Sequence, residues 1–246
     1  MSMSKAKAEN RPLPKRFYSE VAIDPVDEGW RILLDGRPVK TPAREILLAP
    51  GEALADAMAA EWQAQETEIN PFSMPLTRLA HVALDRMDQV RDGAADEIAR
   101  FAGTDMLCYR SDLPDLARRQ AETWDPYLDW AARELDAPLH KAQTILPIEQ
   151  PDASIEALRA HALTLDNWRL TGLASAVPLT GSAVLGFALL KGRLTGEAAF
   201  EAAQLEQDYQ AETWGEDSEA ADMAANRRRD LLAADHLFQL MDAAKT

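Results

Sequence analysis

The chain has only one cysteine, Cys108, among its 246 residues. No internal disulfide can form, and no metal site can be built from several thiolates, so a reducing compartment is expected. Cys108 stands in the apolar stretch Met-Leu-Cys-Tyr, where a lone thiol is more often buried than nucleophilic.

The chain also has fewer basic than acidic residues. It contains 26 Lys and Arg and 41 Asp and Glu, which gives a formal net charge of -15. This charge repels phosphate backbones, so no nucleic-acid partner is expected. It suits a basic or mixed protein surface as partner, although an acidic surface also serves solubility alone.

The residue patterns of catalytic and cofactor sites are missing. The histidines are scattered, none follows a glutamate by three residues, and neither His-Glu-x-x-His nor Gly-x-Ser-x-Gly occurs. Gly181 and Gly186 have the spacing of a phosphate loop, but Phe187 stands where the lysine is needed. We interpret these glycines as sites of close helix packing, and we expect no enzyme, no metal site and no cofactor.

One long uncharged run, residues 170–190, reaches the length of a membrane span. Pro178, Gly181 and Ser182 interrupt it, and Thr180 resembles a helix N-cap, so the run predicts two buried helices joined by a turn. The chain begins with a polar, lysine-containing segment without an apolar run, which is not a secretory signal. Residues 1–15 are predicted to be a flexible tail.

Residues 16–50 have the pattern of a small antiparallel β domain. Asp35-Gly36 is a hairpin signal between the short segments 30–34 and 37–40. The predicted strands cover residues 17–23, 30–34, 37–40 and 45–48.

Residues 51–246 are alanine-rich and predict a larger all-helical domain, so the fold class is α+β. Leu54, Met58 and Trp62 share one helix face, which predicts a structural role for Trp62. The helical pattern of residues 76–101 is interrupted around 87–93, and Pro126 predicts a break or kink in a helix over 113–135.

Residues 138–151 predict an extended linker with a short strand at 144–146. Asp152 or Ser154 is the expected cap of the next helix, and Thr195 that of a later one. These last helices are predicted over residues 154–165, 167–177, 182–190, 196–213 and 217–243.

The acidic end of one predicted helix, residues 205–215, is the candidate binding element. Glu206 lies at the edge of an apolar stripe that includes Leu205 and Tyr209, and Gln210 continues its ridge. From the residues alone, a solvated acidic face is the simpler interpretation. Trp214, directly before a glycine, is either an interface anchor or a contact to the next helix. A second acidic ridge consists of Asp208, Glu212 and Glu216.

Short motifs, each weak alone, follow one another in a recognisable order along most of the chain. They are Arg16-Phe17-Tyr18, Asp35-Gly36-Arg37 with Lys40-Thr41-Pro42, Ala60-Glu61-Trp62 with Gln65, Met74-Pro75-Leu76-Thr77, Thr104-Asp105 with Cys108-Tyr109-Arg110, Trp124-Asp125-Pro126 with Trp130-Ala131, and Leu205-Glu206 with Tyr209-Gln210 and Trp214-Gly215. In these motifs the sequence resembles the assembly chaperones dedicated to the alpha subunit of the F-type ATP synthase, a family of mitochondria and alphaproteobacteria.

The resemblance implies a protein that binds unassembled alpha subunit, covers its beta-facing surface and hydrolyses nothing. It places a functionally critical glutamate at Glu206 and a tryptophan whose loss is damaging at Trp62. Glu206, Gln210 and Trp214 are therefore the predicted partner-binding residues. Since no presequence is evident, the resemblance implies a bacterial cytoplasmic protein with relatives in the mitochondrial matrix, and we expect a monomer without stable membrane insertion. The alternative is an acidic helical adaptor or scaffold for another protein partner.

Overall fold

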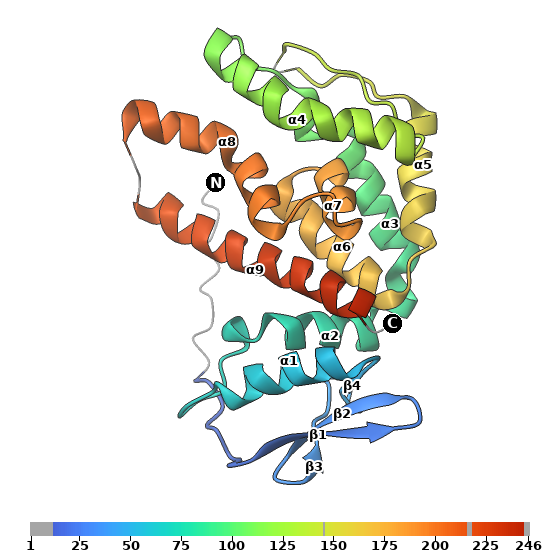
Figure 1. Cartoon of the computed structure of the whole chain (residues 1–246), viewed down its shortest axis with the longest axis vertical. Helices are drawn as coiled ribbons and strands as arrows, with labels where there is room; N and C mark the ends of the chain where they lie inside the picture. The colour runs from blue at the N-terminus through green and yellow to red at the C-terminus, as the bar shows by residue number, and fades with distance from the viewer. Residues whose placement is uncertain (1–11, 145, 216–217, 244–246) are drawn as a thin grey trace, which may run out of the picture.

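The computed structural model describes residues 12–144, 146–215 and 218–243, and the side chains of residue 214 and of residues 218–220 lie outside the described part. A small sheet lies at one end of the molecule and the helices are stacked above it (Figure 1). The α+β class, with an N-terminal antiparallel sheet followed by helices, is confirmed. The predicted tail falls largely outside the described residues, and within it Lys15 forms a bridge with Glu68.

The sheet consists of β1 (Val21–Val26), β2 (Gly29–Leu34), β3 (Arg37–Pro38) and β4 (Leu48–Ala49), with β2 paired antiparallel to the other three. The predicted hairpin turn is confirmed at Asp35 and Gly36, whose φ angles of 47° and 76° are left-handed. At Gly29 a Cβ would lie 2.3 Å from the carbonyl oxygen of Ala49, so only glycine lets β4 approach β2. β4 begins later than predicted, because residues 45–47 form only an isolated bridge between Ile46 and Lys40.

α1 (Glu52–Gln63) covers the sheet and α2 (Pro75–Asp85) packs on α1, and both helices contribute to the core of the sheet (Figure 1). Leu54 and Met58 of α1 are buried there, as their spacing predicted. The end of α9 (Ser218–Ala243) completes the same core with Leu237 and Met241. The core around the sheet thus includes helices from both ends of the helical region, and the domain boundary expected at residue 50 stays a prediction.

Glu61 on α1 fixes the start of α2. The residue before α2, Met74, provides no side-chain cap. Instead, the two carboxylate oxygens of Glu61 accept hydrogen bonds from the N–H groups of Leu76 and Thr77, at 2.7 and 2.8 Å. A carboxylate at this position satisfies free N–H groups and interacts favourably with the helix dipole.

The larger core is built around α6 and α7, which form its centre. They are joined by Gly181, with φ of 68°, and Ser182, whose hydroxyl accepts from Leu185 N at 3.0 Å. The prediction of two buried helices joined by a turn is confirmed, but Thr180 is the last residue of α6 and not a cap. α6 spans Asn167–Thr180 and α7 spans Ala183–Leu190. Around them lie α3 (Met87–Gly103), η2 (Met106–Cys108), α4 (Pro114–Glu134), α5 (Asp152–Leu163) and α8 (Gly196–Trp214), whereas the short η1 (Pro71–Ser73) precedes α2 at the sheet core.

Close packing explains the glycine of α7. A Cβ at Gly186 would lie 2.6 Å from Cγ2 of Val177, so the two helices approach one another more closely than alanine would allow. The interpretation of this glycine as a packing site is confirmed. No helix in the described part of the chain is both long enough and apolar enough to cross a membrane.

Several predicted details are wrong. α4 continues through Pro126, because Trp124 and Leu128 on either side are buried in the larger core and this burial outweighs one lost backbone hydrogen bond. The break predicted at 87–93 lies at Arg86, between α2 and α3. Residues 144 and 146 are not a strand, and residue 145 lies outside the described residues.

The predicted cap of α8 is confirmed, and the predicted cap of α5 is wrong. Thr195 caps α8 as predicted, since its hydroxyl accepts from Ala198 N at 3.2 Å. Neither candidate caps α5: Asp152 is already its first residue, and the Ser154 hydroxyl donates to the carbonyl of Pro138 at 2.7 Å.

Candidate functional site

Glu206 is half-buried on α8, a helix that packs against both α4 and α9. One turn earlier, the carbonyl of Ala202 accepts a hydrogen bond from Nε1 of the buried Trp124 on α4, at 2.9 Å. Oε1 of Glu206 accepts from Nε2 of Gln120, also on α4, at 2.6 Å. Oε2 forms no hydrogen bond or ion pair with any residue in the described part, so it is available to an outside donor.

Gln120 holds this carboxylate from a fully buried position. Its side chain is 0% exposed, and its Oε1 accepts from Ser111 N at 2.8 Å. Sequence reasoning missed Gln120, although the signal was present. It stands at four-residue spacing between Leu116 and Trp124, so an amide occupies a position on the buried face of α4. A buried amide needs partners, and here they are a backbone N–H and Glu206.

Glu206 also lines a cleft of about 550 Å³ between α8, α9 and the α6–α7 turn, which we call the α8–α9 cleft. Met223 on α9 is 62% exposed beside it. The lining of the cleft contains both apolar and polar side chains, which is the mixture found at exchangeable protein interfaces. Its lining residues are Met106, Pro178, Leu179, Thr180, Gly181, Ala203, Glu206, Gln207, Met223, Asn226, Arg227 and Asp230.

The other two predicted binding residues lie further along α8. Gln210 is exposed one turn beyond Glu206. Trp214 ends the helix, but its side chain lies outside the described part, so its prediction has no structural description. The structure therefore brings Glu206 to the cleft and places Gln210 on the adjoining surface.

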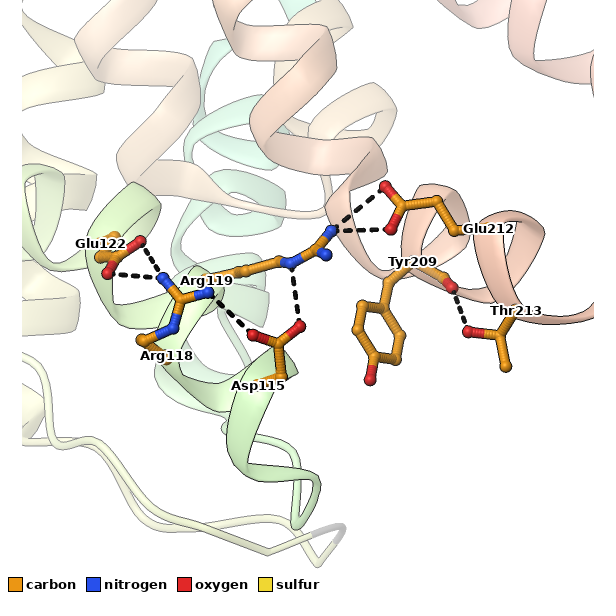
Figure 2. Close-up of polar contacts among 7 residues, drawn as sticks. All are labelled: Asp115, Arg118, Arg119, Glu122, Tyr209, Glu212 and Thr213. Atoms are coloured by element: carbon orange, nitrogen blue, oxygen red, sulfur yellow. Dashed lines mark hydrogen bonds and ion pairs between the residues drawn. The ribbon is translucent and has the colours of Figure 1, made fainter.

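The second acidic ridge is partly neutralised from α4, as Figure 2 shows. Arg119 lies between Asp115 of its own helix and Glu212 of α8, with Nη1 2.9 Å from Oε2 of Glu212. Its guanidinium also lies 5.2 Å from the ring centroid of Tyr209. Glu212 is therefore not simply a solvated charge. Glu216 lies outside the described residues.

A wider groove of about 890 Å³ separates α4 from α8 on the other side of this contact. Asp208 lines it together with Glu201 and Glu212. Partial burial, followed by the charges of Glu212 and Glu201, raises the pKa of Asp208. The α4–α8 groove thus has an acidic wall, whereas the α8–α9 cleft has Glu206 beside apolar side chains.

Trp62 packs where α1 ends against the sheet. Its ring lies edge-on to Tyr18 with centroids 5.9 Å apart, and the Tyr18 hydroxyl donates to the Trp62 carbonyl at 2.7 Å. The indole Nε1 is buried without an acceptor among the described residues. These contacts agree with the structural role predicted for Trp62, which stays a prediction.

Asp105 is a fully buried carboxyl group outside the candidate binding surfaces. It is 0% exposed and accepts from the Ser182 hydroxyl and Val184 N at the start of α7, at 2.9 and 3.1 Å. Burial raises its pKa to about 6, although these hydrogen bonds oppose the shift. Nearby Cys108 is buried, as predicted, and burial raises the pKa of its thiol to about 12. Among the described residues, no group of three His, Cys, Asp or Glu side chains is placed to hold a metal.

The family model described as ATP12 chaperone protein matches residues 15–132. The crystal structure of Atp12 from Paracoccus denitrificans is 41% identical, covers 92% of this chain and 98% of its own, and superposes with a TM-score of 0.86. This chain belongs to the ATP12 chaperone family. It is therefore a chaperone of ATP synthase assembly, as the sequence resemblance implied.

Other ATP12 relatives extend this similarity. The Atu1473 protein of Agrobacterium tumefaciens, a candidate chaperone, is 40% identical, with 94% of this chain and 87% of that one covered and a TM-score of 0.88. The mitochondrial protein atp12 of Schizosaccharomyces pombe is 28% identical over 221 residues, which are 83% of this chain and 76% of the relative. A Paracoccus denitrificans variant in which lysine replaces an aspartate has also been solved, with 41% identity and a TM-score of 0.86.

Proposed function

We propose that this ATP12 family member binds the unassembled alpha subunit of the F-type ATP synthase and covers its beta-facing surface until assembly. The observation that carries the proposal is the state of Glu206. Its carboxylate is held in place by a fully buried amide, yet one oxygen has no partner within the described structure and borders the α8–α9 cleft. A fixed, half-buried acceptor beside apolar groups is well suited to recognise a cationic or amide donor on a client.

Apolar groups of the cleft supply the complementary part of the interaction. Met223 is exposed and flexible, and Met106, Leu179 and Pro178 lie around it. Methionine adapts its shape to an apolar partner surface, which suits a chaperone that must later release its client. We propose that Gln210 and Trp214 extend this contact, and that the protein acts as a cytoplasmic monomer without a catalytic step.

The test uses purified alpha subunit and three forms of the chaperone. Glu206→Lys should weaken alpha binding at least tenfold, because it replaces an acceptor by a cation at the cleft. Glu201→Lys is the matched control, since it makes the same charge change on α8 but faces the α4–α8 groove. Its affinity should stay within twofold of the wild-type value, and circular dichroism should show both variants folded.

Two results would contradict the proposal in different ways. Wild-type affinity in folded Glu206→Lys would remove Glu206 from the interface. Absence of any binding between the wild-type chain and free alpha subunit would reject the client, and capture of a different basic protein through the same residue would then support the adaptor alternative.

A further inference from the structure

A second groove, of about 560 Å³, lies on the sheet. We call it the sheet groove. Figure 1 shows the sheet at the opposite end of the molecule from α4. The lining residues come from the chain entering β1, from the β2–β3 hairpin and from the end of α1, and they are Phe17, Leu34, Asp35, Arg37, Pro38, Val39, Lys40 and Trp62.

Phe17 is an aromatic side chain held on the surface of this groove. It is 73% exposed, whereas the adjoining Tyr18 is buried in the sheet core. The backbone around it is fixed, because the Arg16 guanidinium donates to the carbonyls of Tyr18 and Gln65. The Phe17 ring also packs edge-on against Tyr18, with centroids 5.4 Å apart. Phe17 is thus presented to solvent by a rigid segment, which is the form that interface anchors take.

Two cations beside Phe17, Arg37 and Lys40, form no direct bond within the described part of the chain. Arg37 and Lys40 are exposed, and neither forms a side-chain hydrogen bond or an ion pair with any residue in the described ranges. Asp35, the carboxylate in the lining, accepts hydrogen bonds from the backbone N–H groups of Ser19 and Glu20, at 3.0 and 2.9 Å. These bonds lower its pKa most, and the charge of Arg37 adds to the shift without a direct ion pair between the two side chains. In a chain with a net charge of -15, an exposed aromatic flanked by unpaired cations is complementary to acidic partners rather than basic ones.

We propose that the sheet groove is a second docking site, which takes a client segment carrying an apolar side chain between carboxylates. The apolar side chain covers Phe17 and the exposed part of Trp62, and the carboxylates pair with Arg37 and Lys40. The identity of the client rests on the proposed function, so the segment belongs to the alpha subunit. The cleft at Glu206 and the sheet groove lie on different elements, so one client can contact both. Binding at one site then raises the effective concentration of the client at the other.

The test compares alpha binding by the full-length wild-type chain with that of Arg37→Glu/Lys40→Glu and of Phe17→Ser. All three residues are exposed, so both variants should fold. The charge reversal should weaken binding at least tenfold at low salt and should reduce its salt dependence. The matched control is Arg86→Glu/Lys191→Glu, which changes the net charge equally at exposed positions outside the groove and should stay within twofold of wild type.

A second measurement keeps the proposal independent of small affinity changes. Adding alpha subunit should slow backbone hydrogen exchange around residues 34–40 of the wild-type chain. The slowing should be smaller in Phe17→Ser. One outcome rejects the sheet groove while the proposed function stands. In it, wild type binds alpha subunit and Glu206→Lys does not, but the charge reversal has the affinity and the hydrogen-exchange protection of wild type. If wild type fails to bind alpha, both are rejected. Concentration-dependent dimerisation that the charge reversal abolishes, with unchanged alpha affinity, would assign the groove to a second copy of this chain.

Discussion

Gln120→Leu tests the contact that positions the candidate binding carboxylate. The side chain is fully buried, and the substitution removes two hydrogen bonds while keeping a similar volume. Loss of the bond to charged Glu206 costs about 1.5–3 kcal/mol, and leaving Ser111 N–H without an acceptor costs about 1–3 kcal/mol. Burial of the leucine offsets about 1 kcal/mol of this loss. The free energy of unfolding should therefore fall by about 3 kcal/mol.

Urea unfolding measures this loss, and Gln89→Leu provides the control. Gln89 is an exposed glutamine on α3 with no side-chain hydrogen bond to a described residue, so its replacement should change stability by less than about 0.5 kcal/mol. Binding supplies a second readout, since Gln120→Leu should weaken alpha affinity through Glu206. In a Glu206→Ala background the same substitution should have no further effect on affinity.

The reasoning about Gln120 fails on either of two results. A stability within about 0.5 kcal/mol of wild type would show that the amide and its partners contribute little in the folded state. An affinity loss that persists undiminished in the Glu206→Ala background would show that Gln120 acts on the client by another route.

Substitutions at three further positions test the packing and the buried acid. Gly172→Ala should destabilise the chain by about 1–3 kcal/mol in urea unfolding, because its Cβ would lie 2.4 Å from the buried Phe238 ring. Trp62→Ala should cost about 3 kcal/mol and Trp62→Phe clearly less, since the indole N–H has no acceptor to lose; equal losses would contradict this. Asp105 has a pKa raised from 3.8 to about 6, so the folded state binds more protons than the unfolded state between these values, and stability falls as pH rises through that window. The stability of wild type relative to Asp105→Asn should accordingly fall by about 2.5 kcal/mol between pH 4 and pH 7, and a flat difference would oppose the assignment.

Local patterns predicted most of the elements, because their causes are local. Asp35 and Gly36 adopt left-handed backbone angles by their own chemistry, so the hairpin could be placed from two residues. Thr195 caps α8 within one turn, and the spacing of Leu54 and Met58 defines a face of α1. Pro126 is the instructive error, since its effect on α4 is decided by burial against helices that come later in the sequence.

The parts that could not be predicted depend on distant residues. Glu61 caps α2 from another helix, and Gln120 meets Glu206 across 86 positions of sequence. Arg119 likewise reaches Glu212 from α4. A hydrophobic pattern shows which face of a helix is buried but not which neighbour lies against it, so these contacts required the structure.

The motifs that identify the family separate into two groups once their bonds are known. Arg16, Glu61 and Asp105 each bind several backbone or side-chain groups of the chain itself, so their replacement would act first on folding. Phe17 and Arg37, with Lys40 beside them, belong to the same motifs but contribute little or nothing to internal bonding. Oε2 of Glu206 likewise forms no hydrogen bond or ion pair within the described part of the chain. Membership of a motif therefore does not distinguish a structural residue from a binding residue. The unsatisfied bonding capacity of these side chains is the reason why we propose client contacts at two surfaces, the α8–α9 cleft and the sheet groove.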